Sequence, residues 1–265
     1  MKSVRTRLGE LPLNAYIAFI LVFLYAPILL LLLFSFNDAT IVAFPLGRLT
    51  LHWYRSLTAD ASLLSAIRNS ALIALWAALL STVIAALAAY VMERHRIMGA
   101  ATLTATALAA LVIPALVLGA SLLVLISAAG IKLSLFTILA GHLTVCTPAA
   151  LVIMRTTFAN IHREFEEASR DLGASAVQTF LRVSLPIAWP GIIASLLVSF
   201  TVSLDEFVIS FFLAGSDITL PIYMWSQLRF PQKLPMLLAV ASLQIALSLI
   251  LITLAVWYGK RARRG

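Results

Sequence analysis

Two consecutive acids, Asp205 and Glu206, interrupt an apolar run at 190–213 that is long enough to cross a membrane. A carboxylate at the centre of a membrane helix costs roughly 2.5–3.5 kcal/mol on insertion scales, so it normally faces a cavity or another helix. On a regular helix, four polar residues at spacings of four, three and four share one face: Ser199, Ser203, Glu206 and Ser210. Asp205 lies about 100° around the helix from that face. The pattern predicts a polar stripe that either suits a cationic substrate or holds helices together.

The other residue types that could do chemistry offer less. His142 lies in an apolar run beside Thr144 and Thr147, which is typical of a hydrogen-bonded packing residue, with a proton relay as the alternative. The chain has no G-x-x-x-x-G-K-[ST] stretch for nucleotide phosphates and no pair of His, Cys or carboxylate residues with metal-ligand spacing. No nucleophile sits beside a base in sequence. We therefore expect a non-catalytic chain that holds no cofactor itself.

The composition is that of a membrane protein. Of the 265 residues, 62% are hydrophobic and 11% are charged, and the mean hydropathy is +1.03. Six apolar runs are long enough to cross a hydrocarbon core of roughly 30 Å. They lie at about 16–36, 68–91, 103–127, 135–154, 190–213 and 237–258. Because these runs are continuous rather than alternating, they predict helices and not a transmembrane barrel. We expect an all-α polytopic protein with six transmembrane helices in a single membrane domain over 1–265.

Positive charge is unevenly distributed between these runs. Thirteen of the 19 Lys and Arg residues lie before the first run, just after the second, in the loop 155–186, or at the C-terminus. The positive-inside rule therefore places both termini and the loop 155–186 in the cytoplasm. The net charge of +8 mostly reflects this asymmetry, and no basic cluster is interleaved with a folded aqueous surface, so we expect no binding of nucleic acid.

The loop 155–186 has the pattern of a helical hairpin. Residues 164–172 are good helix formers, and Gly173 is placed to adopt the left-handed conformation that ends a helix. Two pairs of opposite charge stand four residues apart: Arg163 with Glu167, and Glu166 with Arg170. The following stretch has a broad apolar face up to Leu185, before Pro186, and predicts a second helix lying along the membrane surface. From residue types alone, a solvated amphipathic hairpin without a partner is the alternative.

Two motifs in this loop resemble, in order and spacing, the EAA signature of bacterial ABC importer permeases. They are Glu167-Ala168-Ser169-Arg170-Asp171-Leu172-Gly173 and Val183-Ser184-Leu185-Pro186. Ser169 stands where the signature has its second Ala, and Val183 where it has Ile. The resemblance implies that the loop is a coupling helix that docks on an ATP-binding subunit. The coupling residues are then Glu167, Ala168, Ser169, Gly173, Leu185 and Pro186.

Further segments resemble the second permease subunit of spermidine/putrescine-type importers. They are 25–27, 35–37, 49–54, 200–210, 214–215 and 219–221. The resemblance implies a type I ABC importer permease in the bacterial inner membrane. Its partners are then a second permease subunit, two ATP-binding subunits that hold ATP and Mg²⁺, and an external solute-binding protein.

The substrate implied by this resemblance is a polyamine, putrescine or spermidine, or a related cationic or amino-acid-derived solute. The candidate residues along its pathway are Asp205, Glu206, Ser203 and Ser210. The alternative is a stand-alone ion-coupled secondary transporter or channel, in which Asp205, Glu206 and His142 form a relay.

Overall fold

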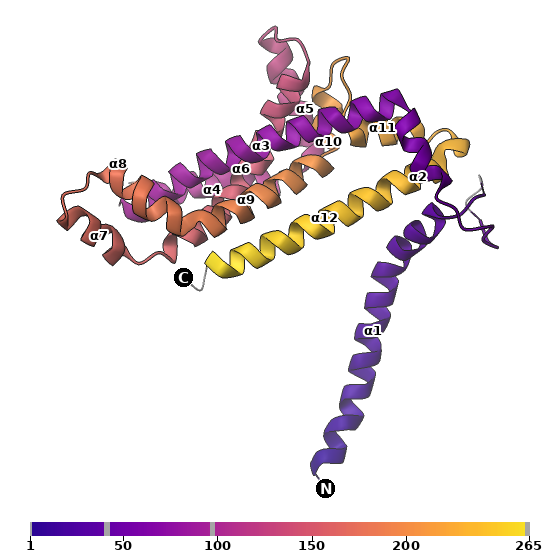
Figure 1. The fold of residues 1–265 in the computed structure, drawn as a ribbon, viewed down its shortest axis with the longest axis horizontal. Helices are drawn as coiled ribbons and strands as arrows, with labels where there is room; N and C mark the ends of the chain where they lie inside the picture. Colours follow the sequence, from indigo (N-terminus) through magenta and orange to yellow (C-terminus); the bar gives the residue numbers. More distant parts are fainter. Residues whose placement is uncertain (1, 40–42, 96–98, 263–265) are drawn as a thin grey trace. The chain divides into compact units, whose positions relative to one another are not determined.

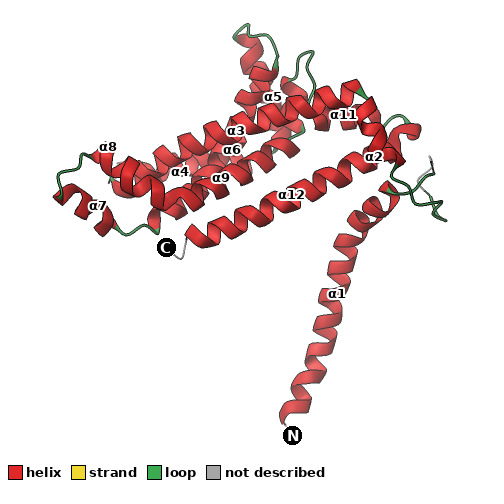
Figure 2. Ribbon diagram, viewed as in Figure 1, coloured by secondary structure: helices red, strands yellow, loops and turns green. Residues whose placement is uncertain are grey.

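The computed structural model describes residues 2–39, 43–95 and 99–262, and this part of the chain consists of helices and connecting loops (Figures 1 and 2). Contacts divide the chain into two compact units. Unit 1 comprises residues 1–60 and 226–245, and unit 2 comprises residues 61–225 and 246–265. The single membrane domain expected from the sequence stays a prediction.

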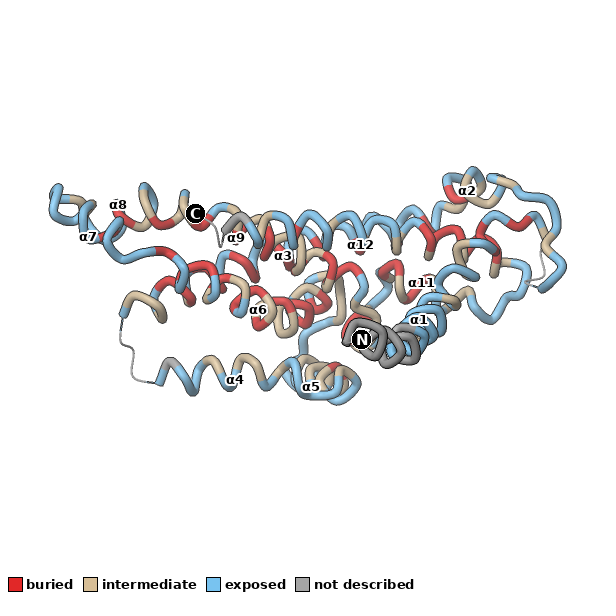
Figure 3. Tube along the Cα trace, turned by 90° about the horizontal axis from the view of Figure 1, so that it is seen from below, coloured by how far each residue is buried: buried red, intermediate tan, exposed pale blue. Residues whose placement is uncertain are grey.

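Unit 2 is organised around three long helices that pack against one another, α3, α6 and α9. The elements with residues in this unit are α3 (Ala61–Arg94), α4 (Ala100–Val112), α5 (Ala115–Ala128), α6 (Leu135–Ala159), α7 (Arg163–Asp171), α8 (Ala176–Thr179), the π-helical segment η2 (Phe180–Ser184), α9 (Leu185–Asp205), α10 (Val208–Leu213), most of α11 (Leu220–Gln227) and the second part of α12 (Leu234–Ala262). Figures 1 and 3 show α7 and α8 together at one end of the three-helix group.

Helices of membrane-spanning length account for most of the described chain. Five helical stretches are long and apolar enough to cross a membrane: Ala15–Ser35, Ala61–Arg94, Leu135–Ala159, Ala176–Asp205 and Pro231–Lys260. The pair α4 and α5 adds a sixth if it counts as one span, although the chain turns by 106° between them. Pro114 explains the turn, because a proline disfavours helical backbone at the preceding residue, and Ile113 has ψ 130°. The all-α class is confirmed, and the predicted run 103–127 is sharply bent.

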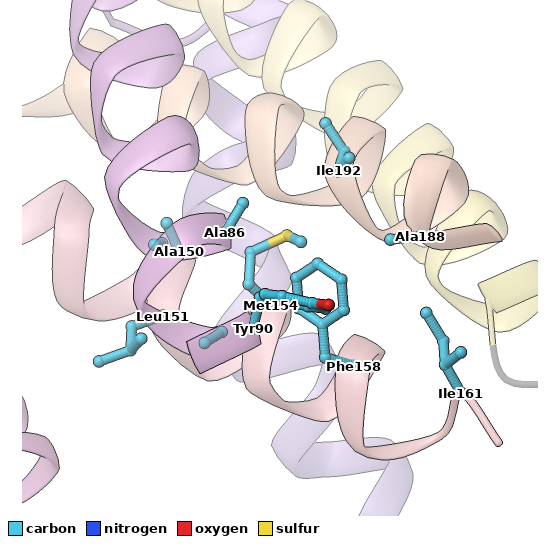
Figure 4. Packing of buried hydrophobic residues seen from close by; sticks show 11 residues of the cluster. Ala86, Tyr90, Ala150, Leu151, Met154, Phe158, Ile161, Ala188 and Ile192 are labelled. Carbon is cyan, nitrogen blue, oxygen red and sulfur yellow. The ribbon is translucent and has the colours of Figure 1, made fainter. Parts of the chain in front are cut away.

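The main core of unit 2 lies where α3, α6 and α9 meet near the α7 end (Figure 4). The rings of Tyr90 and Phe158 pack edge to face with 5.5 Å between their centroids, and Met154 is buried in the same cluster. Small residues at these contacts let the helices approach closely: Ala85, Ala86, Ala89, Ala150 and Ala188. Gly191 of α9 lies so close to Thr157 of α6 that a Cβ at position 191 would collide with the threonine side chain.

A second apolar cluster joins the N-terminal parts of α3 and α6 to α10. Its buried members are Ile73, Ile138, Ile209 and Leu213. Near this end of α3, the Ser70 hydroxyl accepts a hydrogen bond from the Leu220 N–H at 2.7 Å, and the Asn69 amide donates to Ile218 O at 3.0 Å. These bonds attach the segment before α11 to α3. α11 is a short helix of eight residues with buried side chains.

Unit 1 contains α1 (Lys2–Ser35), α2 (His52–Ser56), two short 3₁₀ turns (Leu57–Ala59 and Pro231–Lys233) and the first part of α12. The Trp53 indole N–H donates to Asn37 O at 2.8 Å. The Tyr54 hydroxyl shares hydrogen bonds with the hydroxyls of Ser35 at 2.7 Å and Ser242 at 2.8 Å. The aromatic residues of 49–54 therefore hold this unit together through their polar tips.

Candidate functional site

The loop at 155–186 contains a helical hairpin whose turn is built around Gly173. The Gly173 N–H donates to Arg170 O at 2.8 Å and the Ala174 N–H donates to Ser169 O at 3.2 Å, which is the Schellman arrangement that ends a helix. Gly173 has φ +85°, a left-handed conformation that glycine adopts without the steric cost of a Cβ. The structure confirms the predicted helix and its glycine cap.

The second arm of the hairpin differs from the prediction. α8 begins with a capping box between Ser175 and Gln178 and then continues through the π-helical segment into α9. The predicted surface helix is therefore not separate; it forms the first turns of the 30-residue helix Ala176–Asp205. The Leu185 N–H bonds to Phe180 O, five residues back, and such wider turns accommodate prolines such as Pro186 inside membrane helices.

The six predicted coupling residues lie on or near the outer surface of this hairpin. Glu167, Ala168, Gly173 and Pro186 are exposed, and Ser169 and Leu185 are partly buried. Two apolar side chains that the sequence reasoning did not single out as contacts are also exposed, Leu172 at 90% and Val177 at 67%. Apolar groups gathered on an exposed surface are typical of a binding interface.

Glu166, the acid that precedes the motif, faces into the protein and not outward like the exposed motif residues. Its Oε1 accepts hydrogen bonds from Arg94 Nε at 2.8 Å and from the Ser184 hydroxyl at 2.7 Å. Arg94 also donates to Ile161 O at 3.0 Å, and both charged side chains are almost fully buried, at 6% and 4% exposure. Removing one partner of such a pair costs about 3–5 kcal/mol, because the other charge stays buried without compensation. Glu166 thus pairs with α3 rather than with Arg170 on its own helix.

A second, more exposed ion pair lies beside it. Arg155 of α6 contacts Glu93 Oε1 of α3 at 2.8 Å and donates to the Thr104 hydroxyl of α4 at 3.1 Å. Arg163 of α7 donates to the backbone oxygen of Glu93 at 2.7 Å. The C-terminal end of α3 therefore receives polar contacts from α6 and α7, and Arg155 also joins α6 to α4.

The predicted polar stripe meets a break in the fifth span. α9 ends at Asp205, Glu206 is extended with ψ 103°, and α10 begins at Val208. The Glu206 carboxylate accepts the Ile209 N–H at 3.0 Å, and its backbone oxygen accepts the Ser210 hydroxyl at 2.8 Å. The prediction of one continuous helix over 190–213 is therefore wrong. Glu206 satisfies backbone groups that the break leaves without helical partners, and this stabilises the break.

Two stripe residues still converge, on a residue from another helix. His142 of α6 is 1% exposed, with Nδ1 at 2.7 Å from the Ser203 hydroxyl and Nε2 at 2.8 Å from the Ser210 hydroxyl. The Ser210 hydroxyl already donates to Glu206 O, so it accepts from Nε2–H, and Nδ1 then accepts from Ser203. His142 is a neutral, hydrogen-bonded packing residue that joins both sides of the break. Its partners lie 61 and 68 residues away, which no local pattern reveals.

The two acids at the break differ in exposure. Asp205 is exposed at the C-terminal end of α9, where the helix dipole favours positive charge, and Glu206 is partly buried. Within the described residues, no group of three His, Cys, Asp or Glu side chains is arranged to hold a metal ion. The break therefore presents one exposed and one partly buried carboxylate.

Comparison with known proteins decides the family. The family described as "Binding-protein-dependent transport system inner membrane component" matches residues 81–264. The chain belongs to this family. It is a multi-pass inner-membrane permease subunit of a binding-protein-dependent ABC importer. Membership of this family does not support the alternative of a stand-alone ion-coupled transporter.

Several curated relatives in this permease family are similar over most of the chain. The spermidine/putrescine transport system permease protein PotC of Haemophilus influenzae is 32% identical over 243 residues, which cover 91% of this chain and 94% of the relative. PotC of Escherichia coli K12 is 31% identical and covers 92% of each chain. The putrescine transport system permease protein PotI of Escherichia coli K12 is 35% identical over 78% of this chain and 76% of its own.

Solved structures agree on the fold of the permease. A chain of a bacterial ABC transporter that imports the acidic polysaccharide alginate matches with a TM-score of 0.74 and 17% identity, over 97% of this chain and 98% of the other. A second structure of the alginate transporter, in complex with an alginate pentasaccharide-bound periplasmic protein, matches with a TM-score of 0.69 and 16% identity, over 98% and 95%. At this identity the match concerns the fold alone.

Proposed function

We propose that this permease takes up a polyamine or a related cationic or amino-acid-derived solute. It works with a second permease subunit, an external solute-binding protein and two ATP-binding subunits that bind ATP and Mg²⁺ and carry out the hydrolysis. Both termini and the hairpin lie in the cytoplasm, which the distribution of Lys and Arg supports. The observation that carries the proposal is the exposed hairpin, which presents the EAA-like residues on a glycine-capped turn.

The hairpin is the docking element for an ATP-binding subunit. Glu167 offers an exposed charge, Ala168 allows close approach, and Leu172 and Val177 offer apolar surface. Gly173 fixes the direction of the turn that presents them. Closure of the ATP-binding subunits then moves the hairpin and switches the membrane cavity between its two sides, which is alternating access.

The docking proposal is tested by co-purification. Gly173→Asp should leave the chain inserted at normal abundance but abolish recovery of the ATP-binding subunit and ATP-driven uptake, because it alters the turn and adds a charge at the interface. Gly99→Asp is the matched control, since Gly99 also has a positive φ, +87°, and open space around its Cβ position. Gly99→Asp should keep the ATP-binding subunit, and a subunit that stays attached to Gly173→Asp contradicts the proposal.

The substrate proposal rests on the transport systems to which the relatives belong and on the acids at the break. Asp205 and Glu206 are the candidate partners for the ammonium groups, with Ser203 and Ser210 along the same pathway. The α9 break supports this role, because the ends of interrupted helices commonly bind ions in transporters.

Uptake of radiolabelled putrescine tests this role. Glu206→Gln keeps an oxygen that can accept the Ile209 N–H and removes the charge, so we expect about tenfold slower uptake, a loss of about 1.4 kcal/mol, at unchanged abundance. Asp217→Asn, at an exposed acid in the loop after α10, is the control and should transport normally. Unchanged uptake by Glu206→Gln means that Glu206 is structural.

A further inference from the structure

One carboxylate oxygen joins three segments of the hairpin end. Glu166 of α7 accepts Arg94 Nε of α3 and the hydroxyl of Ser184, the last residue of the π-helical segment, on the same Oε1. Arg94 also donates to the backbone of Ile161, in the connection between α6 and α7. α3, the α6–α7 connection, α7 and the base of α9 therefore meet at one buried ion pair.

α3 is not next to the hairpin in the sequence, so its connection to the hairpin depends on side-chain contacts. The hairpin is joined through the backbone to α6 on one side and to α9 on the other, and to α3 only through side chains. Besides the buried pair, the described link between α7 and α3 is the exposed bond from Arg163 to Glu93 O. An exposed contact of this kind contributes little. Of these two polar links between α7 and α3, the buried pair is the stronger, and the rings of Tyr90 and Phe180 join α3 to the second arm of the hairpin.

α3 carries this connection to the other end of unit 2. From Arg94 back to Ser70 the helix is continuous, a length of about 36 Å at 1.5 Å per residue. At that end Ser70 and Asn69 hold the segment before α11 through two hydrogen bonds. α3 thus connects Arg94 to the loop between α10 and α11.

We propose that Arg94 and Glu166 are positioning residues for energy coupling. They make the hairpin and α3 move as one body, so that closure of the ATP-binding subunits displaces α3 as well as α9. The proposal rests on the proposed docking of the hairpin. It adds a second route, through α3, by which nucleotide binding reaches the segment before α11.

The test removes the ion pair between Arg94 and Glu166 and fills its space with apolar side chains. In Arg94→Met/Glu166→Leu both charges are replaced by apolar side chains, a change that buried pairs tolerate well. A reporter cysteine replaces Ile67, which is 38% exposed near the N-terminal end of α3, in a Cys146→Ser background that removes the only native cysteine. The complete importer, purified through this chain, is treated with a maleimide with and without ATP and vanadate, and ATP hydrolysis is measured on the same preparation.

In the importer with Arg94 and Glu166 intact, we expect ATP and vanadate to change the labelling rate of the reporter cysteine by at least about threefold. In the double variant, the ratio of the labelling rates with and without ATP and vanadate should fall to about one, while ATP hydrolysis persists. Arg155→Gln, which breaks the neighbouring pair with Glu93, is the control and should keep the nucleotide-dependent change. The proposal is overturned by an unchanged ratio in the double variant, by loss of its ATP hydrolysis, or by absence of any nucleotide effect without the substitutions. An importer that contains no ATP-binding subunit overturns instead the proposed function.

Discussion

Polar side chains are buried at both ends of the α9 helical stretch, but different interactions satisfy them at each end. At the hairpin end, a full ion pair between Arg94 and Glu166 is buried among the helix ends. At the break, buried His142 is joined to Ser203 and Ser210 by neutral hydrogen bonds, while Asp205 is exposed and Glu206 accepts a backbone N–H. Because an isolated charge costs most within the hydrocarbon region, paired charges suit the membrane edge and neutral networks suit its interior. The difference predicts unequal sensitivity to substitution.

The largest effect is expected at the ion pair. Glu166→Ala leaves Arg94 charged and buried, which should cost about 3–5 kcal/mol of stability and lower the thermal unfolding midpoint of the detergent-purified chain. Glu164→Ala, at an exposed position on the same helix, should cost no more than about 1 kcal/mol. Equal midpoints for the two variants contradict the assigned role of the pair.

A smaller effect is expected at the break. His142→Leu keeps a similar volume but removes both hydrogen bonds, leaving the Ser203 hydroxyl without its partner, so we expect a loss of about 1–3 kcal/mol in the same thermal measurement. Thr144→Val is the matched change, because the Thr144 hydroxyl donates to Gly141 O of its own helix. A larger loss for His142→Leu than for Glu166→Ala would reverse the comparison.

The smallest effect is expected at the turn that separates the two arms of the hairpin. Gly173→Ala meets no atom within 4 Å, so its cost is only the backbone strain of a left-handed residue, about 1 kcal/mol. Gly173→Asn should cost less, since Asn tolerates that conformation better than Ala. Thermal midpoints that fall as far as in Glu166→Ala would show that the turn has contacts beyond its backbone.

The parts of the fold that depend on local sequence could be predicted. Continuous apolar runs indicated the spanning helices, and Gly173 indicated the end of α7. The break at Glu206 contains neither glycine nor proline, so no sequence signal marks it. It depends on the Glu206 side chain accepting a backbone N–H, which is visible only in three dimensions.

The sequence motif of the candidate site could be predicted, but the contacts that hold the hairpin in place could not. The EAA-like residues could be located by spacing, because they belong to one short hairpin. Arg94 lies 72 residues from Glu166, and a local pattern instead suggested a pair with Arg170. The π-helical segment was not predicted either, although it ends two residues before Pro186, a residue that such a wider turn accommodates.

The contact between Gly191 and Thr157 has a consequence for how this sequence can change over generations. Any side chain at 191 meets the Thr157 β-carbon as well as its hydroxyl, so shortening the threonine to alanine does not make enough room. Only loss of the side chain at 157 opens the space. Drift at these two sites should therefore be coupled, with glycine retained at one position whenever the other gains a β-carbon.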